Sequence, residues 1–481
     1  MSRFLLVSVL LFACAPKPVP PPAPVFEVPA PVDPLAERPV IGPSVPFIPP
    51  TPEVGALSNG AKLWVVPRPG LPLVSLVIHV PGGSALDPKG HEGAGWLSDR
   101  LMTQGSGKLD AKAFSEVIER LGVQLEITTE LDGSYLRASM KKDQWGTALA
   151  MIADVVMYPN WSVVDFKRER ELAIGELTQA QQEPPTVAAR MAQALWYGAK
   201  HPWGHPAEGT VAGMAKVTVK DVQRHHKLAW TSTGATITIA GDITRIEAQS
   251  TLEGALGNGW KQGKAANVEA KPAPAEKDRP LYLIDTPGAA QTMFYVTFPG
   301  RTAGAPELSA LRAGTIVLGG TFTSRLNALL REKKGYTYGA KARTQPRNAD
   351  GTAVVFSRIR TDVTGPAMAD LLGELKSIQA GITPEELGKA KGAFKQDQVE
   401  AMESCAGAAD AFAAYQAGGF GENQLALDLG AMQAVTAEQV KAEMAAYDVK
   451  NALFMLVGDK AKIEAGLKEA GISRIEVVEP E

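Results

Sequence analysis

The sequence contains few of the residues on which several kinds of chemistry depend. Its 481 residues include two cysteines and six histidines. Excess charge is also small, because the formal net charge is −3 and no basic stripe with interleaved aromatic residues occurs. A chain this close to neutral exerts no long-range attraction on a polyanion. Binding to nucleic acid is therefore not expected.

Long hydrophobic runs are missing as well. The apolar run near the N-terminus, Phe4–Phe12, is too short to span a bilayer. It follows Arg3 and precedes Cys14, which is the order of an export signal. The sequence LFAC at 11–14 is similar to a bacterial lipobox, which implies a signal peptide over 1–13 and lipidation of Cys14. A plain cleaved signal and an uncleaved hydrophobic tail remain the alternatives.

The residues after this signal indicate where the protein is held. Ala15, rather than aspartate, follows Cys14, which resembles lipoproteins that are sent on to the outer membrane. We therefore expect an exported protein at the periplasmic face of a bacterial membrane, with the outer membrane favoured. Residues 14–52 are dense in proline and form a semi-rigid tether. Once Cys14 is acylated, Cys405 is the only thiol; its alanine-rich context indicates a small core residue rather than a nucleophile.

The rest of the chain has the composition and order of two globular domains. Hydrophobic residues make up 45% and charged residues 21%, and the length favours more than one domain. Both halves follow one order, ending in a strand before Gly-Asp at 241–242 and at 458–459. We predict two related α+β domains, 53–256 and 281–481, joined by a polar linker at 257–280. The strands are expected at 61–66, 73–80, 123–128, 134–139, 235–240, 292–298, 336–341, 353–359 and 452–457, and the helices at 95–103, 111–121, 144–157, 162–182, 306–318, 323–331, 366–380 and 383–413.

Several ordered segments resemble one family. They read PGGSALDPKGHEGAGWLSDRLMTQGS, KRERELAIGELTQAQQEPP, HPWGHPAEGTVAGMAKVTVKDVQRHH and LGGTFTSRLNALLREKKGYTYGA. With these segments the chain resembles the insulinase (pitrilysin) family of zinc peptidases, in its short two-domain form, from about Val54 to Val478. The resemblance implies two homologous domains, each an antiparallel-rich sheet packed with helices, which together form half of a clamshell.

The resemblance also shows what has been lost. Active members carry H-x-x-E-H on the first helix, with both histidines on one helix face as zinc ligands and the glutamate as general base. At these positions the chain has Trp96, Asp99 and Arg100. An indole N–H only donates, and a guanidinium has no lone pair to give, so neither can ligate a metal. We expect no zinc in this chain and no cofactor of another kind.

The third ligand position is retained. Glu176 follows Arg100 by 76 positions, within the family's usual spacing, and Glu169 matches a further acidic position. One carboxylate, even with Asp99, is a poor zinc site. We expect Arg100 to face Glu176 and to pair with it where the metal would lie. The alternative is that Arg100 points to solvent and Glu176 is paired elsewhere.

None of the remaining histidines restores the lost pair. His91 precedes the helix in a glycine-rich loop, His201 and His205 flank Pro-Trp-Gly, and His225 and His226 lie at a polar helix end. Each is interpreted as a loop or surface histidine.

The second half retains chemistry. The family uses an arginine and a tyrosine, seven positions apart, to hold substrate and stabilise the oxyanion, and Arg331 and Tyr338 have that separation. Guanidinium and phenol are both donors, as an oxyanion requires. Tyr336 is expected on the same strand face as Tyr338. The plain alternative is an arginine at a helix end and a tyrosine packed in a sheet.

In this family, loss of the zinc motif together with retention of the Arg/Tyr pair is typical of a zinc-free subunit. Some family members work as heterodimers in which one chain carries zinc and the other contributes the Arg/Tyr pair. We therefore expect a non-zinc subunit acting with a zinc-bearing partner on extended peptides. The alternative is a catalytically inactive peptide-binding or scaffold lipoprotein of the same fold. A hydrolase with a relocated site is the third option, and no residues for one are found.

Overall fold

Each half of the chain contains a six-stranded sheet, whose central strands are buried along most of their length. The computed structural model describes residues 42, 45–264, 266 and 271–480. The predicted signal, Cys14 and most of the tether lie outside these residues. Within them, the α+β class predicted from the sequence is confirmed. None of the described helices has the length and apolar character needed to cross a membrane.

The first sheet has the strand order β1-β2-β8-β3-β7-β6. β3 runs antiparallel to β7 and β8, whereas β2 and β8 are parallel. β6 is therefore an edge strand. The strands are β1 (Glu53–Ala56), β2 (Lys62–Pro67), β3 (Leu73–Pro81), β6 (Gln124–Thr129), β7 (Gly133–Lys141) and β8 (Thr236–Gly241), and a separate pair is formed by β4 (Gly105–Ser106) and β5 (Leu109–Asp110).

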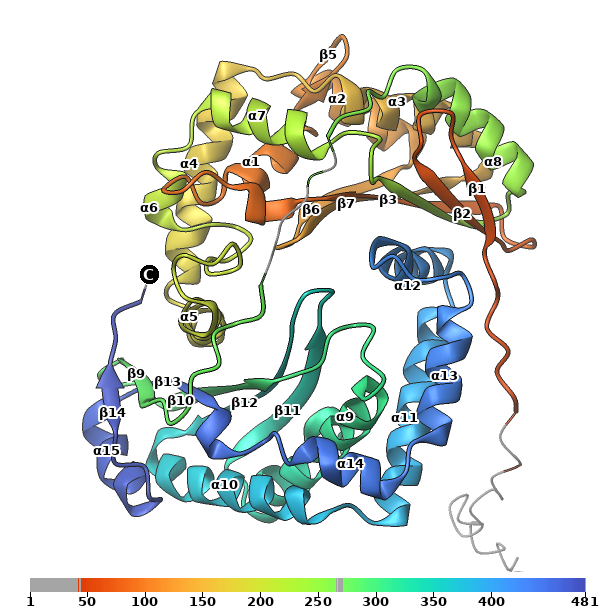
Figure 1. Ribbon diagram of the computed structural model, residues 1–481. Helices are drawn as coiled ribbons and strands as arrows, with labels where there is room; N and C mark the ends of the chain where they lie inside the picture. Colours follow the sequence, from red (N-terminus) through yellow and green to blue (C-terminus); the bar gives the residue numbers. More distant parts are fainter. Residues whose placement is uncertain (1–41, 43–44, 265, 267–270, 481) are drawn as a thin grey trace, which may run out of the picture. The chain divides into compact units, whose positions relative to one another are not determined.

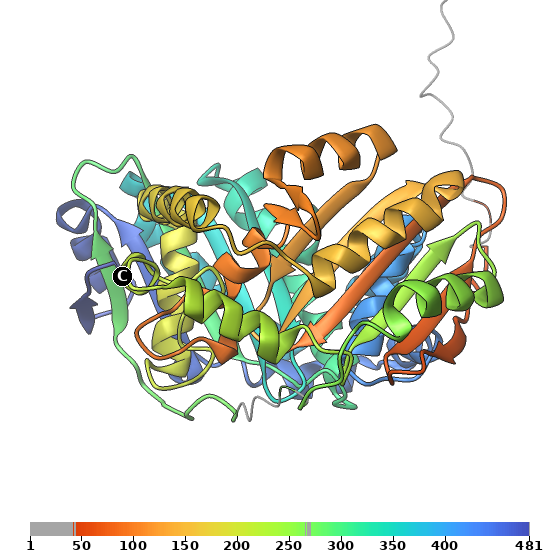
Figure 2. The same cartoon turned by 90° about the horizontal axis from the view of Figure 1, so that it is seen from above.

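Helices cover one face of this sheet. Leu76, Ile78 and Leu136 point from the strands into a core that Trp145 and Leu149 close from above. Figure 2 shows the helices of this layer, α2 and α3 in orange and α7 and α8 in green, lying over the strands. The helices of this half are α1 (Ala94–Leu101), α2 (Ala111–Leu121), α3 (Trp145–Met157), α4 (Val163–Ala180), α5 (Pro184–Tyr197), α6 (Val211–Met214), α7 (Val219–Ala229) and α8 (Arg245–Leu252).

The second sheet has the order β11-β12-β10-β13-β9-β14, so that β11 is an edge strand. Its strands are β9 (Leu281–Asp285), β10 (Gln291–Pro299), β11 (Thr337–Pro346), β12 (Gly351–Arg360), β13 (Leu453–Gly458) and β14 (Ile475–Val477). Its helices are α9 (Leu308–Thr315), α10 (Thr364–Ala380), α11 (Pro384–Ala401), α12 (Cys405–Ala417), α13 (Gln424–Ala434), α14 (Ala437–Met444) and α15 (Lys460–Glu469), with π-helical segments at Ile316–Gly320 and Asn327–Lys333.

Each half places one helix on the sheet of the other half. α5 packs against β10 and β13, and α12 packs against β3 and β8 (Figure 1). The α12 contact is polar, because Arg137 Nε lies 2.6 Å from Asp410 Oδ1 and Thr238 Oγ1 donates to Gln416 Oε1 at 2.7 Å. The face of each sheet that lacks the main helical layer is thus partly covered by the opposite half.

Three predicted boundaries are wrong for local reasons. The helix expected from Pro306 begins at Leu308, two residues after the proline. The helical region expected over 383–413 is broken, because Ser404 accepts a hydrogen bond from the Gly407 N–H and starts α12 as its N-cap. The helix expected over 162–182 ends earlier, at Ala180, and Pro184 begins a further helix, α5, that was not predicted, since proline is tolerated in a first turn.

Candidate functional site

The helix that would carry a zinc motif, α1, is fixed by its first turn. Gly93 precedes it with φ 106°, and Asp87 accepts the backbone N–H groups of Gly93 at 2.6 Å and Gly95 at 2.7 Å. Burial raises the pKa of Asp87 to about 8, an effect that these two donors oppose. A side chain at Gly95 would collide with the His225 ring at 2.6 Å, so α1 lies directly against α7. This packing orients the side chains that follow.

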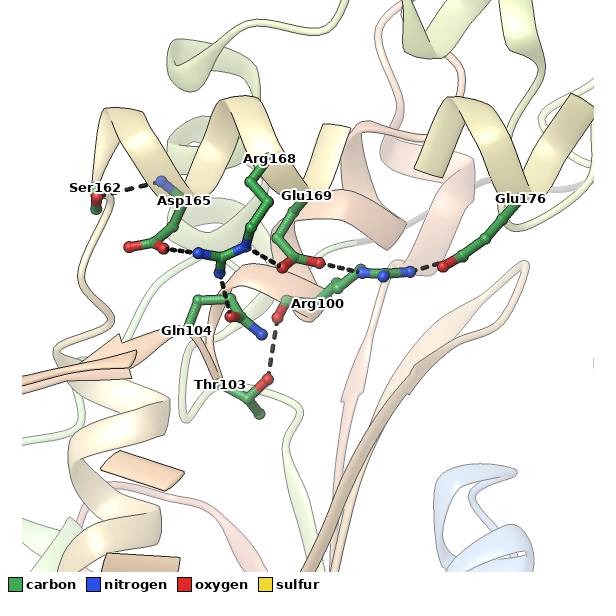
Figure 3. Close-up of polar contacts among 8 residues, drawn as sticks. All are labelled: Arg100, Thr103, Gln104, Ser162, Asp165, Arg168, Glu169 and Glu176. Atoms are coloured by element: carbon green, nitrogen blue, oxygen red, sulfur yellow. Dashed lines mark hydrogen bonds and ion pairs between the residues drawn. The ribbon is translucent and has the colours of Figure 1, made fainter. Parts of the chain in front are cut away.

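Arg100 bridges two carboxylates of α4 (Figure 3). Its Nε lies 2.6 Å from Glu169 Oε2, and its Nη1 lies 2.7 Å from Glu176 Oε2. Its guanidinium also lies 5.2 Å from the centre of the Trp96 ring. The predicted Arg100–Glu176 pair is therefore confirmed, and the alternative of a solvent-facing Arg100 is wrong.

Glu169 is the carboxylate whose role the sequence did not reveal. It is 5% exposed and accepts a second charged donor, because Arg168 Nε lies 3.2 Å from its Oε1. Arg168 is held in turn by Asp165 at 2.6 Å. The seven-residue interval between Glu169 and Glu176 is about two helical turns, which places both on the face toward α1. That spacing was the signal available in the sequence.

Asp99 does not share this site. Its side chain is buried, with 1% exposure, and its two oxygens accept Thr129 Oγ1 at 2.6 Å and Trp230 Nε1 at 2.8 Å. The residue at the general-base position is thus committed to a structural link between α1, β6 and the end of α7.

These residues do not fit a zinc ion. A guanidinium occupies the space between Glu169 and Glu176, and it would repel a cation there. Within the described ranges, no group of three or more histidine, cysteine, aspartate or glutamate side chains converges as metal ligands would. Arg100, Glu169 and Glu176 form ion pairs with one another and leave no site between them for a catalytic metal ion.

The histidines divide differently from the prediction. His91 pairs with Asp221 at 2.9 Å, and His201 and His205 contact backbone carbonyls, as loop residues do. His225 and His226 are not surface residues: His225 is 2% exposed, and His226 contacts the Val156 carbonyl at 2.9 Å. His225 is covered because α1 packs closely on α7, whereas His226 is partly buried against Val156 and Trp161; burial lowers the pKa of both rings.

Arg331 and Tyr338 lie at an open surface of the second half. The Arg331 guanidinium stacks on Phe322, 4.2 Å from the ring centre, and its Nε lies 3.4 Å from Glu332 Oε1. Phe322 is itself 60% exposed, and Tyr338 is 90% exposed. Tyr338 is thus not packed in the sheet, as the plain alternative required.

Tyr336 does not share the surface of Tyr338. It precedes β11 and packs against the hydrophobic core of the second half, with Lys334 Nζ 5.8 Å from its ring centre. A register irregularity between Thr337 and Ala340 breaks the alternation on which the prediction depended. The expectation that both tyrosines line one wall is wrong.

The segment before Arg331 is anchored by contacts that sequence reasoning missed. Arg325 pairs with Glu386 through two bonds, of 2.6 and 2.8 Å, and this pairing lowers the pKa of Glu386 to about 2. The Asn327 amide donates to the Thr321 carbonyl at 2.9 Å and exchanges two hydrogen bonds with the backbone of Ala340. These contacts tie the Phe322–Arg331 surface to α11 and β11.

A cavity of about 860 Å³ lies between the halves, next to the Arg100 centre. Trp96 and Glu176 line it from the first half, together with residues of α5. The opposite wall is formed by alternate side chains of β10, β11 and β12, among them Tyr295, Arg343 and Phe356. Local sequence patterns do not indicate this cavity, because its walls come from segments of both halves that are distant in the sequence.

Comparisons with known proteins agree with this architecture. Residues 68–203 match the family described as Insulinase (Peptidase family M16), and residues 216–394 match the one described as Peptidase M16 inactive domain. The "Uncharacterized zinc protease YmxG" of Bacillus subtilis is 22% identical over 72% of this chain and 83% of its own length. The "Non-peptidase homolog YmxG" of Helicobacter pylori is also 22% identical, over 69% and 77%.

A solved structure shows the same fold. It is a peptidase M16 inactive domain from Pseudomonas fluorescens, with a TM-score of 0.78 and 22% identity over 85% of this chain and 98% of that chain.

Since the two matched stretches together make up well over half of the sequence, the chain belongs to the insulinase (M16) peptidase family. Its first half has an arginine where a zinc ligand would stand, and a relative carries the name of a non-peptidase homolog. Within the family, its zinc motif is degenerate, with Trp96, Asp99 and Arg100 at the motif positions.

Proposed function

We propose that this chain is the non-zinc subunit of an exported insulinase-like metallopeptidase. In this proposal a second family member carries the zinc, and this chain contributes substrate binding and oxyanion stabilisation to the partner's reaction. The observation that carries the proposal is an asymmetry. The zinc position is closed by the Arg100 ion pairs, whereas Arg331 and Tyr338 are held at an open surface.

The geometry around Arg331 suits a donor that acts on a group outside this chain. Its guanidinium is held by Phe322 stacking and by a neighbouring carboxylate, which leaves N–H groups free to face a ligand. Tyr338, the second residue of β11, supplies a second donor, its phenol O–H. Two donors directed at one oxygen stabilise a developing oxyanion, and we propose that bound peptide and the partner chain order the exposed Tyr338 for this role. The partner's zinc would supply the activated water.

Extended peptides are the substrates that the sheets favour. β6 and β11 are edge strands whose outer backbone groups have no neighbouring strand in the described chain. An extended peptide can add to such an edge through main-chain hydrogen bonds, with specificity set by its alternate side chains. Substrate binding by strand addition is therefore part of the proposal.

Mixing the purified chain with a zinc-bearing family member from the same organism tests the proposal. We expect co-elution on size exclusion and peptidase activity toward an unstructured peptide that neither chain shows alone. Arg331→Gln should remove that activity. Arg474→Gln, which removes an exposed arginine beside β14, is the matched control and should not affect it. Absence of both a complex and Arg331-dependent activity would refute the proposal.

The second candidate function is a peptide-binding or scaffold protein that performs no chemistry. The cavity beside the Arg100 centre favours it, because both walls come from this chain alone. In the mixing experiment this candidate predicts peptide binding without activity and no effect of Arg331→Gln.

The proposed location depends on residues 1–13 and Cys14. We propose that Cys14 is acylated and that residues 14–52 tether the folded part to the periplasmic face of a membrane, with the outer membrane favoured. Metabolic labelling with a fatty-acid analogue should mark the wild-type chain and not Cys14→Ser. Equal labelling of the two would contradict the lipid anchor.

A further inference from the structure

The cavity contains an arginine for which the described part of the chain supplies no carboxylate. Arg343 lies on β11, and its Cζ is 5.5 Å from the centre of the Phe356 ring. Phe356 stacks on Tyr295, with ring centres 5.7 Å apart, and the Tyr295 side chain is hydrogen-bonded to Arg343. No described aspartate or glutamate lies within ion-pair distance of Arg343. The guanidinium is therefore held against Phe356 and remains exposed, with no described carboxylate beside it.

The first half contains a similar arginine that is stacked on an aromatic ring and is paired with a carboxylate. Arg137 stacks on Tyr135, 4.9 Å from the ring centre, and pairs with Asp410 of α12 at 2.6 Å. An arginine on an aromatic ring thus occurs on the inner face of both sheets. In the first half α12 brings a carboxylate to it, whereas in the second half α5 packs on β10 and β13 and brings none to Arg343.

The other charges of the cavity leave Arg343 as the available cation. Arg190 lies 3.9 Å from Glu208, and Arg347 lies 3.8 Å from Asp132. The wall formed by β10, β11 and β12 carries Arg343 and Arg347 and no acidic residue, whereas the facing wall carries Glu130, Glu176 and Glu208. A bound carboxylate is therefore attracted to the sheet wall, because the arginine of the facing wall, Arg190, already lies beside Glu208.

We propose that this cavity binds an extended peptide by pairing a carboxylate of the peptide with Arg343. The cavity, at about 860 Å³, is within the range of roughly 300–1,000 Å³ typical of ligand sites. Tyr295, Phe356 and Trp196 provide apolar contacts for neighbouring side chains. A guanidinium matches a carboxylate through two parallel bonds. The inference rests on the proposed handling of peptides, but it requires no partner chain.

A degenerate heptapeptide library, prepared with free and with amidated C-termini, tests the proposal on the purified chain without a partner. Bound peptides are recovered and sequenced. Enrichment of aspartate or glutamate in both libraries identifies an acidic side chain as the source of the carboxylate. Preferential recovery of the free over the amidated library identifies the C-terminal carboxylate instead.

The variants decide whether Arg343 is responsible. Arg343→Gln should lower the affinity for a selected peptide about tenfold or more, since a hydrogen bond to a charged group is lost. Arg358→Gln is the matched control. Arg358 lies two positions after Phe356 on β12 and therefore on the same face of the sheet, but it does not line the cavity. Arg343→Lys keeps the positive charge but cannot form two parallel hydrogen bonds to one carboxylate, so it should lose only part of the affinity. Circular dichroism confirms that each variant is folded.

Recovery of no peptides, recovery without carboxylate enrichment, or equal binding by the wild type and a folded Arg343→Gln would each overturn the inference. Arg474→Gln, at an exposed residue outside the cavity, should bind the selected peptides normally in this assay. Failure here is therefore distinct from failure of the two-chain proposal, which is measured by Arg331-dependent activity.

Discussion

At the scale of single residues, Arg100 determines the character of the former metal site. Its guanidinium satisfies Glu169, a carboxylate with 5% exposure, and extends to Glu176, whose side chain is 51% exposed. Leaving a buried carboxylate without its charged donor costs about 1–3 kcal/mol or more. The same side chain that excludes a cation therefore stabilises the contact between α1 and α4.

If this is a metal site closed by substitution, restoring its ligands should restore binding. Trp96→His with Arg100→His places two imidazoles four residues apart on α1, opposite Glu176. We expect the double variant to bind one zinc ion per chain and the wild type to bind none in stoichiometric amount, measured by elemental analysis after gel filtration.

The single variant Trp96→His, which retains Arg100, is the control and should bind no zinc. Stoichiometric zinc in the wild type would overturn the interpretation of α1. A folded double variant without zinc would show that the Trp96, Arg100 and Glu176 side chains do not converge as the structure places them.

The Arg325–Glu386 pair should make stability depend on acid. Arg325 lowers the folded-state pKa of Glu386 from 4.5 to about 2, so the folded state binds fewer protons than the unfolded state between these values. The stabilisation is present above about pH 4.5 and is lost as the pH falls toward 2. Urea unfolding of the wild type and Glu386→Gln should differ by about 1–3 kcal/mol at pH 6.

This difference should shrink steadily between pH 4.5 and 2. A difference that stays constant across that interval would contradict the depressed pKa of Glu386. Lys389→Gln, which removes an exposed partner of Glu385 on the same helix, serves as the control and should show little pH-dependent difference.

Sequence reasoning reached some of these residues and missed others. The Arg100–Glu176 contact followed from the family spacing, because a helix face fixes where the side chain points. The inward turn of Asp99 depends on Thr129 and Trp230, which approach from separate elements, and the burial of His225 depends on a glycine in α1. Such partners are set by tertiary packing, which local spacing does not report.

At the scale of elements, the exchange of α5 and α12 between the sheets holds the halves together. α5 contributes Met191 and Ala192 to an apolar cluster with Met293 and Leu453. α12 instead uses polar contacts, including Arg137–Asp410 and Thr238–Gln416. The two contacts should therefore respond differently to salt.

A double-mutant cycle with Arg137→Gln and Asp410→Asn measures the polar contact. The side chains are 29% and 43% exposed, so we expect a coupling energy of about 0.2–1 kcal/mol that decreases at high salt. Amide exchange should speed up in α12 and not in α5. Zero coupling together with unchanged exchange in α12 would contradict an ion pair that helps to hold this helix.

Element types were easier to predict than element ends. Alternation located β7, whose buried side chains fall at every second position, whereas β3 was located by its largely apolar run, as expected of a strand covered on both faces. The π-helical segment at Asn327–Lys333 was read as an ordinary helix, since no local pattern distinguishes the two. The irregular start of β11 was missed for the same reason, and with it the separation of Tyr336 from Tyr338.

At the scale of the whole molecule, the two halves carry different chemistry. The first half has closed its metal position with charge pairs that involve Arg100, Glu169 and Glu176. The second half presents Arg331 and Tyr338 outward on a surface anchored by Arg325 and Asn327. This division is the physical basis for proposing that a second chain completes the chemistry.

The most direct measurement is the turnover of the reconstituted pair with Arg331→Gln in this chain. A donor used only in the transition state lowers kcat when it is removed, by about a hundredfold to a thousandfold for an oxyanion donor. The account predicts a fall of that order in kcat, a smaller change in KM and no change for Arg474→Gln. Full kcat with a folded, partner-bound Arg331→Gln chain would contradict it.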